Sequence, residues 1–426
     1  MYIDQELKGA KMKIAGIIAE YNPFHRGHAY HIETTRTRTD ADFVIVAMSG
    51  NFVQRGAPAA ADKYTRTNMA LLGGADLVLE LPVCAAVSSA ETFARSGIAL
   101  FQALHGVTHI SFGCESADDP ALLQLSDLFA REPEGYRLLL SSYLKEGLSF
   151  PAARAKAAAQ VLTDAHTAKI LKSPNNILAI EYLKAIRQSD SDLIPCMISR
   201  SGKGYHDMAT SKEHSRDFCS ATALRNLLLS SKPDAIKQEL ASQIPAESLA
   251  PFQDWLRTYG IITEEDLSFL LHYKLMLQEG TYPDFGSCSK EFARRIANKA
   301  EQFTSFGQFC ASLKSKDMTY TAISRYLIQF LLDIRPSDLE ILTQCSYAPY
   351  GRILGFRRSA APLLTQLKKS QIPLIFHLAK DAPTLSSDAL HLLDIDIRSA
   401  HIYHTLMTQK SGHPAKNEFR HPLIYV

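Results

Sequence analysis

The residues best suited to chemistry lie in one short segment, residues 13–31, with the sequence KIAGIIAEYNPFHRGHAYH. Its apolar start predicts a buried strand, which ends at Asn22-Pro23 before a helical pattern resumes. The loop between strand and helix therefore carries His25 and His28. A helix N-terminus stabilises an anion through its free N–H groups and dipole. The two imidazoles add hydrogen-bond donors for charge that develops on a phosphate during displacement.

Two other interpretations of these histidines stay open on the residues alone. They could line an ordinary surface turn, because a bare His-x-Gly-His spacing is a weak signal. They could also bind a metal together with His31, since the three histidines are spaced three apart. His25 precedes the expected helix, however, and no cysteine or carboxylate cluster lies close by in the sequence. We therefore expect a nucleotide phosphate at this loop and no dedicated metal site.

The composition is that of a globular protein with one large or two ordinary domains. The chain has 426 residues, of which 46% are hydrophobic and 21% charged. No apolar run reaches the roughly 18 residues of a membrane span, and the start lacks the apolar stretch of a signal peptide. The seven cysteines are scattered without C-x-x-C spacing, which favours reduced thiols. We expect a cytoplasmic protein without a membrane partner, and in residues 1–11 a disordered extension or a start upstream of the functional one at Met12.

Strand-like and helical segments alternate through the first half of the chain. The strand-like runs cover residues 13–19, 42–48, 76–81, 109–114 and 194–199, and the clearest helices cover 65–72, 89–104 and 176–186. Such alternation predicts a parallel sheet covered by helices on both faces, with ligands at the carboxyl ends of its strands. Residues 120–161 are helical and too long for a simple crossover, so they are expected to form an insertion.

The second half has a different pattern and charge. After about residue 235 amphipathic helices dominate, at 264–278, 290–303 and 319–333, with one short strand near 373–376. Residues 286–380 contain fourteen Lys and Arg against six Asp and Glu, although the whole chain has a net charge of only +2. We predict a catalytic α/β domain at 12–234 and a mainly helical, basic domain at 235–426. A basic helical half suggests a polyanion such as RNA, with a solvated helical surface as the alternative.

Further groups lie where a nucleotide site would recruit them. The loop 49–56, SGNFVQRG, follows the second strand, and Asp62, Lys63 and Arg66 share the next helix, where a solvated face is an equal alternative. Gly113 at the end of the fourth strand allows a planar base or ribose to approach the backbone. Cys114 beside it has no adjacent His or Asp and is expected to be packing rather than a nucleophile.

The remaining candidate site residues lie between residues 175 and 225. Asn175 and Asn176 begin a helix, where one of them caps it or reads a nucleotide edge. Arg200 ends the last strand and could bind a phosphate, with a surface ion pair as the alternative. Ser220-Ala-Thr-Ala-Leu-Arg225 looks like a helix start for a second phosphate cluster.

The strand followed by His-x-Gly-His resembles the nucleotidyltransferase superfamily with a HUP-like, Rossmann-type sheet, although the second phosphate motif departs from that superfamily's usual form at Ala221 and Leu224. More specifically, the chain from Met12 onward resembles the bacterial tRNA(Met) cytidine acetate ligases. The motifs that carry this resemblance are EYNPFHRGHAYH, SGNFVQRG, DKYTR, GADLVLELP, SFGCES, SPNNILAIEYLKAI and ILGFRR. Ala57, where a Glu is usual, and Cys114, where a Ser is usual, are modest departures.

The resemblance implies an ATP site and its residues. The ATP-binding residues would be Ile18, Ala19, Glu20, Tyr21, Asn22, Pro23, Phe24, His25, Arg26, Gly27, His28, Ala29, Tyr30, His31, Gly113, Asn175, Asn176 and Arg200. His25, His28 and Arg225 would be catalytic, with Mg²⁺ accompanying ATP. We further expect Arg352, Arg357 and Arg358 of the basic half to contact tRNA.

The resemblance also implies a reaction. Acetate and ATP would form acetyl-adenylate, and the acetyl group would pass to N4 of the wobble cytidine of elongator tRNA(Met), without an obligate protein partner. Two alternatives stay open at this point. One is an adenylyltransferase for a small phosphorylated metabolite, which the long helical half disfavours. The other is a non-catalytic RNA-binding protein, which the presence of both histidines, Arg200 and Arg225 disfavours.

Overall fold

The computed structural model describes residues 12–426 apart from 165, 200–218, 231–232, 287 and 317. Its central sheet contains five parallel strands in the spatial order β5-β2-β1-β6-β7. They are β1 (Ile14–Ala19), β2 (Phe43–Ser49), β5 (Leu77–Leu81), β6 (Val107–Cys114) and β7 (Ile194–Ser199). All five strands predicted from the sequence are confirmed, and with them the Rossmann-type α/β class.

The order of these strands determines where a ligand can bind. The chain begins in the middle of the sheet at β1, builds outward through β2 to β5, and then crosses back to add β6 and β7 on the other side. The connections that follow β1 and β6 therefore leave the sheet in opposite directions. In open α/β sheets, ligands bind in the crevice that such a reversal creates at the carboxyl ends of the strands.

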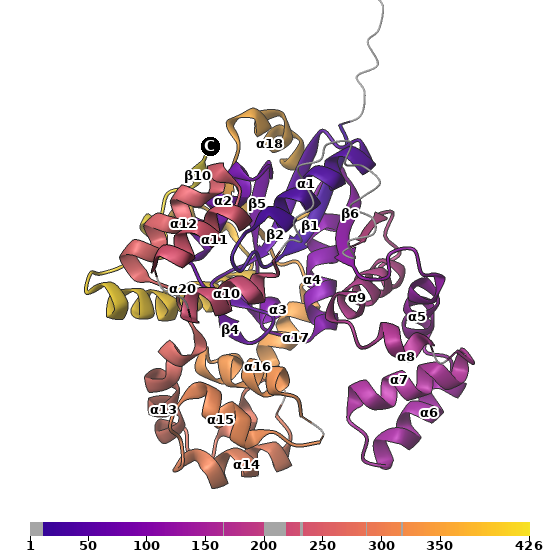
Figure 1. Cartoon of the computed structure of the whole chain (residues 1–426). Coiled ribbons are helices and arrows are strands. Elements are labelled where there is room, and N and C mark those ends of the chain that lie inside the picture. The colour runs from indigo at the N-terminus through magenta and orange to yellow at the C-terminus, as the bar shows by residue number, and fades with distance from the viewer. Residues whose placement is uncertain (1–11, 165, 200–218, 231–232, 287, 317) are drawn as a thin grey trace, which may run out of the picture.

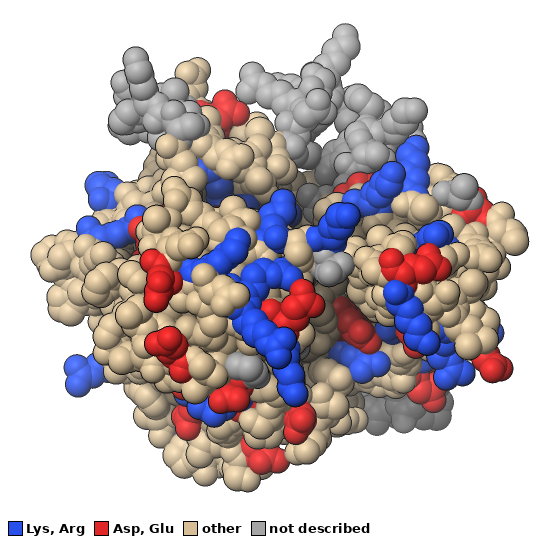
Figure 2. All heavy atoms as spheres, turned by 90° about the horizontal axis from the view of Figure 1, so that it is seen from below, with Lys and Arg blue, Asp and Glu red and all other residues tan. Residues whose placement is uncertain are grey.

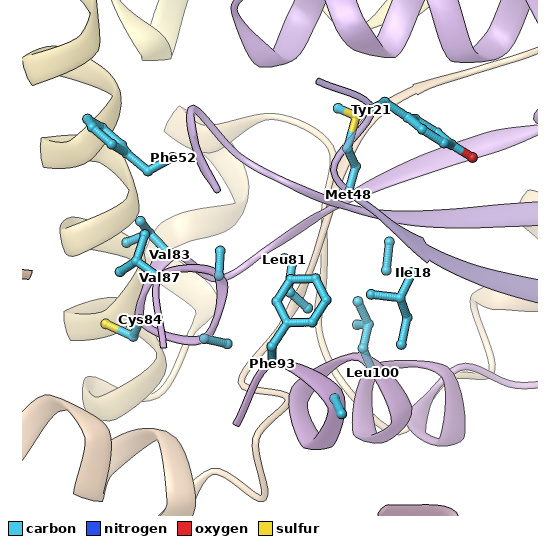
Figure 3. Close-up of a cluster of buried hydrophobic side chains, with 14 of the residues drawn as sticks. Ile18, Tyr21, Met48, Phe52, Leu81, Val83, Cys84, Val87, Phe93 and Leu100 are labelled. Carbon is cyan, nitrogen blue, oxygen red and sulfur yellow. The ribbon is translucent and has the colours of Figure 1, made fainter. Parts of the chain in front are cut away.

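Helices pack against the strands and close the core between them. Those of the first half are α1 (Arg26–Thr39), α2 (Lys63–Leu72), α3 (Val83–Ala86), α4 (Ala90–Ala103) and α9 (Pro174–Gln188). They confirm the three helices predicted there, and α1 contacts β1, β2, β6 and β7. Figure 3 shows Phe93 and Leu100 of α4 pointing toward Ile18 and Leu81 on the sheet. This core holds the carboxyl end of β1 in place.

Two segments are added to the alternating strands and helices of the first half. A short hairpin of β3 (Phe52–Val53) and β4 (Ala57–Pro58) follows β2. Between β6 and β7 the chain adds α5 (Pro120–Arg131), α6 (Glu134–Lys145), α7 (Phe150–Val161) and α8 (His166–Ile170), at the lower right of Figure 1. This confirms the insertion predicted at residues 120–161.

The second half begins with helices and ends on the sheet. Its elements are α10 (Ala221–Ser230), α11 (Pro233–Gln243), α12 (Ala246–Tyr259), η1 (Glu264–Leu267), α13 (Ser268–Leu277), η2 (Tyr282–Asp284), α14 (Lys290–Ala300), α15 (Phe306–Leu313), α16 (Tyr320–Leu331), α17 (Pro336–Gln344), β8 (Gly351–Phe356), η3 (Arg358–Ala360), α18 (Ala361–Leu367), β9 (Leu374–Ile375), α19 (Leu378–Asp381), η4 (Ala382–Thr384), α20 (Ser387–Ser411), η5 (Glu418–Arg420) and β10 (Ile424–Tyr425). Helices α13 to α16 lie together at the lower left of Figure 1.

The last part of the mainly helical region predicted at 235–426 returns to the central sheet. Strand β8 pairs antiparallel with β5, and β9 and β10 pair with β8, so the end of the chain extends the central sheet. β9 confirms the strand predicted near 373–376, but β8 and β10 were missed. β8 is short, with two large aliphatic residues between glycines, and its antiparallel pairing requires no crossover helix that would have revealed it.

Four charged side chains meet where β8 joins β5. Lys63 Nζ lies 2.9 Å from Glu80 Oε1 and 3.0 Å from Glu418 Oε2. Arg352 Nη1 lies 2.9 Å from Glu80 Oε2, and its Nη2 lies 2.6 Å from Glu418 Oε2. All four side chains are buried, at 0 to 5% exposure. Burial by itself raises the pKa of Glu418, but Lys63 and Arg352 lower it well below its usual range.

This buried cluster corrects one expected RNA contact. Arg352 was predicted to bind tRNA, yet its guanidinium is enclosed by the protein and committed to two carboxylates. Lys63 is likewise part of the interior rather than a solvated helix face. Arg352 therefore joins the end of the chain to the sheet and is not available to an RNA.

Candidate active site

The N-terminus of α1 is organised by the two histidines of the HxGH segment. His25 is the N-cap residue, and its Nδ1 accepts a hydrogen bond from the Gly27 N–H at 3.0 Å. In return, His28 Nδ1 accepts from the His25 N–H at 3.3 Å, which makes a reciprocal capping box. The two rings stack with centroids 3.8 Å apart. His28 thus lies in the first turn of the helix, one element further than the loop position that the sequence suggested.

Nδ1 of both imidazoles accepts a backbone N–H in this cap. In the neutral ring the proton is then on Nε2, so Nε2 is the donor atom of each imidazole. A donor on a short helix turn is held by the backbone, so it needs little reorganisation when charge develops nearby. The arrangement suits stabilisation of an anion at the N-terminus of α1.

The loop before α1 is rigid because its side chains pack inside the protein. Tyr21 has a left-handed backbone conformation, with φ of 49°, and its ring meets Phe24 edge-on and lies 4.8 Å from the His28 ring centroid. The Asn22 side chain accepts from the Ala60 N–H at 2.7 Å. Ile18 and Phe24, two of the predicted ATP contacts, have side chains that are buried in the core. These two residues could therefore contact ATP only through their backbone atoms. The loop is thereby pre-organised around the two histidines.

The ends of β6 and α9 form the opposite side of the crevice. Asn176 Oδ1 accepts from the Glu115 and Ser116 N–H groups, at 2.9 and 3.1 Å. The Glu115 carboxylate accepts in return from Asn175 Nδ2 and from the Asn176 N–H, at 2.5 and 3.1 Å. Gly113 lies two residues earlier on β6 and is half-buried. The structure thus brings Gly113, Asn175 and Asn176 together beside β1, and shows that Asn176 fastens the strand end to the helix start.

Helix α10 carries Arg225, the arginine predicted beside the second phosphate cluster. Arg225 Nη1 donates to the Asn22 carbonyl oxygen at 2.6 Å, and its Nη2 donates to Thr222 Oγ1 at 3.1 Å. Burial lowers the pKa of Arg225, and Glu20 opposes that shift. Arg225 therefore lies against the loop that precedes α1. Arg200, the other predicted phosphate ligand, lies outside the described residues.

The other predicted contacts are spread along α1. Arg26 is exposed, and Ala29, Tyr30 and His31 are half-buried. His31 Nε2 lies 3.0 Å from Ser111 Oγ on β6, which also accepts from Thr35 Oγ1 at 2.7 Å. His31 is therefore turned toward the sheet rather than grouped with His25 and His28. Within the described ranges, no cluster of three or more His, Cys, Asp or Glu could hold a metal ion.

Arg66, which the sequence analysis grouped with Asp62 and Lys63, is a positioning residue. It lies on α2, is completely buried and donates to four backbone carbonyls, and the partners are Ala61, Glu20, Ser49 and Gly50. Glu20 directly follows β1, and Ser49 ends β2. Arg66 therefore ties together the carboxyl ends of two neighbouring strands. The only available sequence signal was its helical spacing from Asp62 and Lys63, which a solvated helix face would produce as well.

Replacing Arg66 by lysine is expected to lower the free energy of unfolding by about 2 kcal/mol, because a single ammonium group cannot reach four carbonyls that are buried. Urea denaturation measures the change. The matched control is Arg131→Lys on α5, where the side chain is 77% exposed, and this variant should stay within about 0.5 kcal/mol of the parent. Equal stability of the two variants would contradict the positioning role.

The described residues contain no helix long and apolar enough to cross a membrane. A family model described as HIGH Nucleotidyl Transferase matches residues 12–418. Among curated proteins, the tRNA(Met) cytidine acetate ligase of Clostridium novyi is 36% identical over 92% of this chain and 95% of its own length. The enzyme of the same name from Halothermothrix orenii is 34% identical, over 97% of this chain and 99% of its own.

A solved structure has the same architecture. The crystal structure of Thermotoga maritima TmcAL bound with alpha-thio ATP aligns with a TM-score of 0.87 at 27% identity, and it covers 97% of this chain and 99% of that one. The apo form of the same protein matches equally well. With the HxGH helix cap, the strand reversal and the matched length together, the chain belongs to the HIGH nucleotidyl transferase family and, within it, to the tRNA(Met) cytidine acetate ligases.

Proposed function

We propose that this protein activates acetate with ATP and transfers the acetyl group to N4 of the wobble cytidine of elongator tRNA(Met). The observation that carries the proposal is the capped N-terminus of α1, where His25 and His28 are fixed beside the reversal between β1 and β6. Relatives named for this reaction match over nearly the whole chain. That length of agreement favours the ligase over a compact adenylyltransferase for a small metabolite.

In the first half-reaction, an acetate oxygen attacks the α-phosphorus of ATP and pyrophosphate leaves. The positive end of the α1 dipole and the imidazoles of His25 and His28 stabilise charge on the phosphates. Arg225 is placed by Asn22 and Thr222 so that its remaining N–H groups can meet the leaving pyrophosphate. The backbone near Gly113 and the start of α9 is proposed to bind the nucleoside.

In the second half-reaction, the cytidine N4 attacks the acetyl carbonyl carbon, AMP leaves, and N4 loses a proton. A mixed anhydride reacts with water, so the RNA base must enter before the intermediate diffuses away. Single-stranded loops are the usual targets of sequence-specific RNA recognition, because their bases can be turned outward. An anticodon base meets that requirement.

Mg²⁺ is proposed to enter with ATP. Mg²⁺ is usually held by substrate phosphates with one or two carboxylates, and the described residues offer no cluster of three protein ligands near the crevice. The residues thus fit a metal carried by the triphosphate, which neutralises part of its charge.

The surface proposed to receive the tRNA is basic but mixed. Seen from below the view of Figure 1, Lys and Arg side chains gather across the middle of the face, with Asp and Glu among them (Figure 2). Of the expected contacts, Arg358 is exposed, while Arg357 is half-buried and donates through Nε to the Leu71 carbonyl at 3.0 Å. Both arginines follow β8 beside the start of β5, at the end of the sheet opposite the N-terminus of α1, and they stay predictions as tRNA contacts.

The experiment is acetate-dependent exchange of pyrophosphate into ATP, followed by mass analysis of tRNA nucleosides. Exchange that requires acetate, and acetylated cytidine once tRNA(Met) is added, are the expected results. Exchange with a phosphorylated metabolite but not with acetate would replace the proposal by the adenylyltransferase alternative.

A further inference from the structure

Arg325 on α16 is a half-buried arginine with no counter-charge. Within the part of the chain that the structure describes, its guanidinium takes part in no hydrogen bond or ion pair. Burial lowers the pKa of Arg325, and no ionised neighbour opposes the shift. Keeping a desolvated cation unpaired costs stability in the free protein. A guanidinium in this state can form an ion pair with an anionic ligand.

Arg325 is held close to the active-site loop by a direct backbone contact. Gly56 lies between β3 and β4 with φ of +81°. A Cβ atom at Gly56 would lie 2.3 Å from the backbone nitrogen of Arg325. Ser324 Oγ donates to the Gly56 carbonyl in the same contact. Only glycine permits this approach. Helix α16 of the helical region is therefore fastened to the hairpin that follows β2.

A second arginine lies on the other side of this contact. Arg55 precedes Gly56, so its Cα is at most about 8 Å from that of Arg325, given ~3.8 Å between successive Cα atoms. Its side chain is exposed, and Nη1 donates to Thr222 Oγ1 at 3.3 Å. Thr222 is the hydroxyl that Arg225 also uses. Among the described residues, Arg55, Arg225 and Arg325 form no ion pair with a carboxylate.

These contacts form a line of cations that leads away from the nucleotide. It begins at Arg225 beside the HxGH loop and continues through Thr222 to Arg55, and the backbone of Arg325 on α16 lies directly across Gly56 from Arg55. The inner end is already used by the proposed triphosphate site. The outer end belongs to a helix outside the central sheet. Phosphodiesters of an RNA backbone are the anions that arrive at regular spacing along such a line.

We propose that Arg325 and Arg55 bind backbone phosphates of the acceptor tRNA next to the cytidine that is acetylated, an inference that rests on the proposed function. The test compares Arg325→Met with the parent protein. Methionine keeps the apolar stem and removes only the charge. Arg131→Met, an exposed arginine on the insertion, is the matched control.

Binding of a tRNA(Met) transcript is measured against salt concentration. Arg325→Met is expected to weaken binding by about tenfold or more and to reduce the slope of log affinity against log salt by about 1, whereas Arg131→Met should change neither. Acetate-dependent exchange needs no tRNA and should stay within about twofold. The melting temperature should be equal to or above that of the parent, because a half-buried charge without a counter-charge has been removed.

Three results would overturn the inference. An unchanged salt slope would mean that no phosphate is bound. Loss of exchange with unchanged tRNA affinity would assign Arg325 to the nucleotide instead, and a lowered melting temperature would make it structural. Failure of the proposed function is recognised separately, since the parent protein itself would then show no acetate-dependent exchange while its tRNA binding can still be compared.

Discussion

Replacing His28 by alanine is expected to lower acetate-dependent ATP–pyrophosphate exchange by about 100- to 1000-fold, the usual effect of removing one fixed donor from a site where charge develops. We propose two separable roles for His28. Its Nδ1 caps the backbone of His25, and its Nε2 would donate to the phosphate. The alanine variant loses both, so a second variant is needed to tell them apart.

His28→Asn provides that comparison. The asparagine side chain can accept from the His25 N–H, as in an ordinary helix cap, but it does not reproduce Nε2 of the imidazole. If Nε2 acts on the phosphate, the asparagine variant should melt like the parent and still lose at least tenfold in exchange rate. Near-normal exchange in His28→Asn would limit His28 to capping. Fold is checked by circular dichroism, and the rate by exchange of labelled pyrophosphate into ATP.

The sequence predicted the parts of this site that depend on neighbours along the chain. The HxGH spacing identified His25 and His28, because strand, turn and helix follow each other within 13–31. The five parallel strands were visible because each is an apolar run bounded by turns. Arg66 and Arg352 could not be placed in this way. Both look like surface charges in their own segments, and apart from Ala61 beside Arg66 the partners named for them lie 16 to 272 positions away.

The same limitation explains the missed strands. β8 is recognisable only through its partner β5, which is more than 270 positions earlier. The sequence near a strand gives no information about a partner so far away, whereas the residues of a helix cap are neighbours in the sequence. The helices predicted at 264–278, 290–303 and 319–333 are confirmed for this reason, whereas the return of the chain to the sheet at β8 and β10 was not predicted.

Replacing Glu418 by alanine is expected to reduce the free energy of unfolding by about 3–5 kcal/mol, the usual cost of removing one partner from a buried ion pair. Lys63 and Arg352 would then share only Glu80 in a site closed to water. The loss is a large fraction of a typical stability of about 5–15 kcal/mol. Chemical denaturation at neutral pH measures it. An exposed control, Glu33→Ala, should stay within about 0.5 kcal/mol of the parent.

A double variant tests the cause. Glu418→Met combined with Arg352→Met removes one charge of each sign and leaves Lys63 paired with Glu80. It should be less destabilised than Glu418→Met alone, because no buried charge is left without a partner. Losses that simply add would show that packing, not charge balance, sets the cost. The pH dependence has a defined sign: since the folded protein lowers the pKa of Glu418, this stabilisation is present at neutral pH and is lost as the solution becomes acidic.

The late pairing of β8 with β5 has a consequence for synthesis. The segment Leu77–Leu81 leaves the ribosome long before residues 351–356, so the nascent protein carries an apolar strand whose edge has no partner during most of its translation. Such an edge is a template for pairing with other chains. A product that terminates before residue 351 therefore faces aggregation rather than a mere loss of activity, and the last 76 residues act as the cover that ends this exposure.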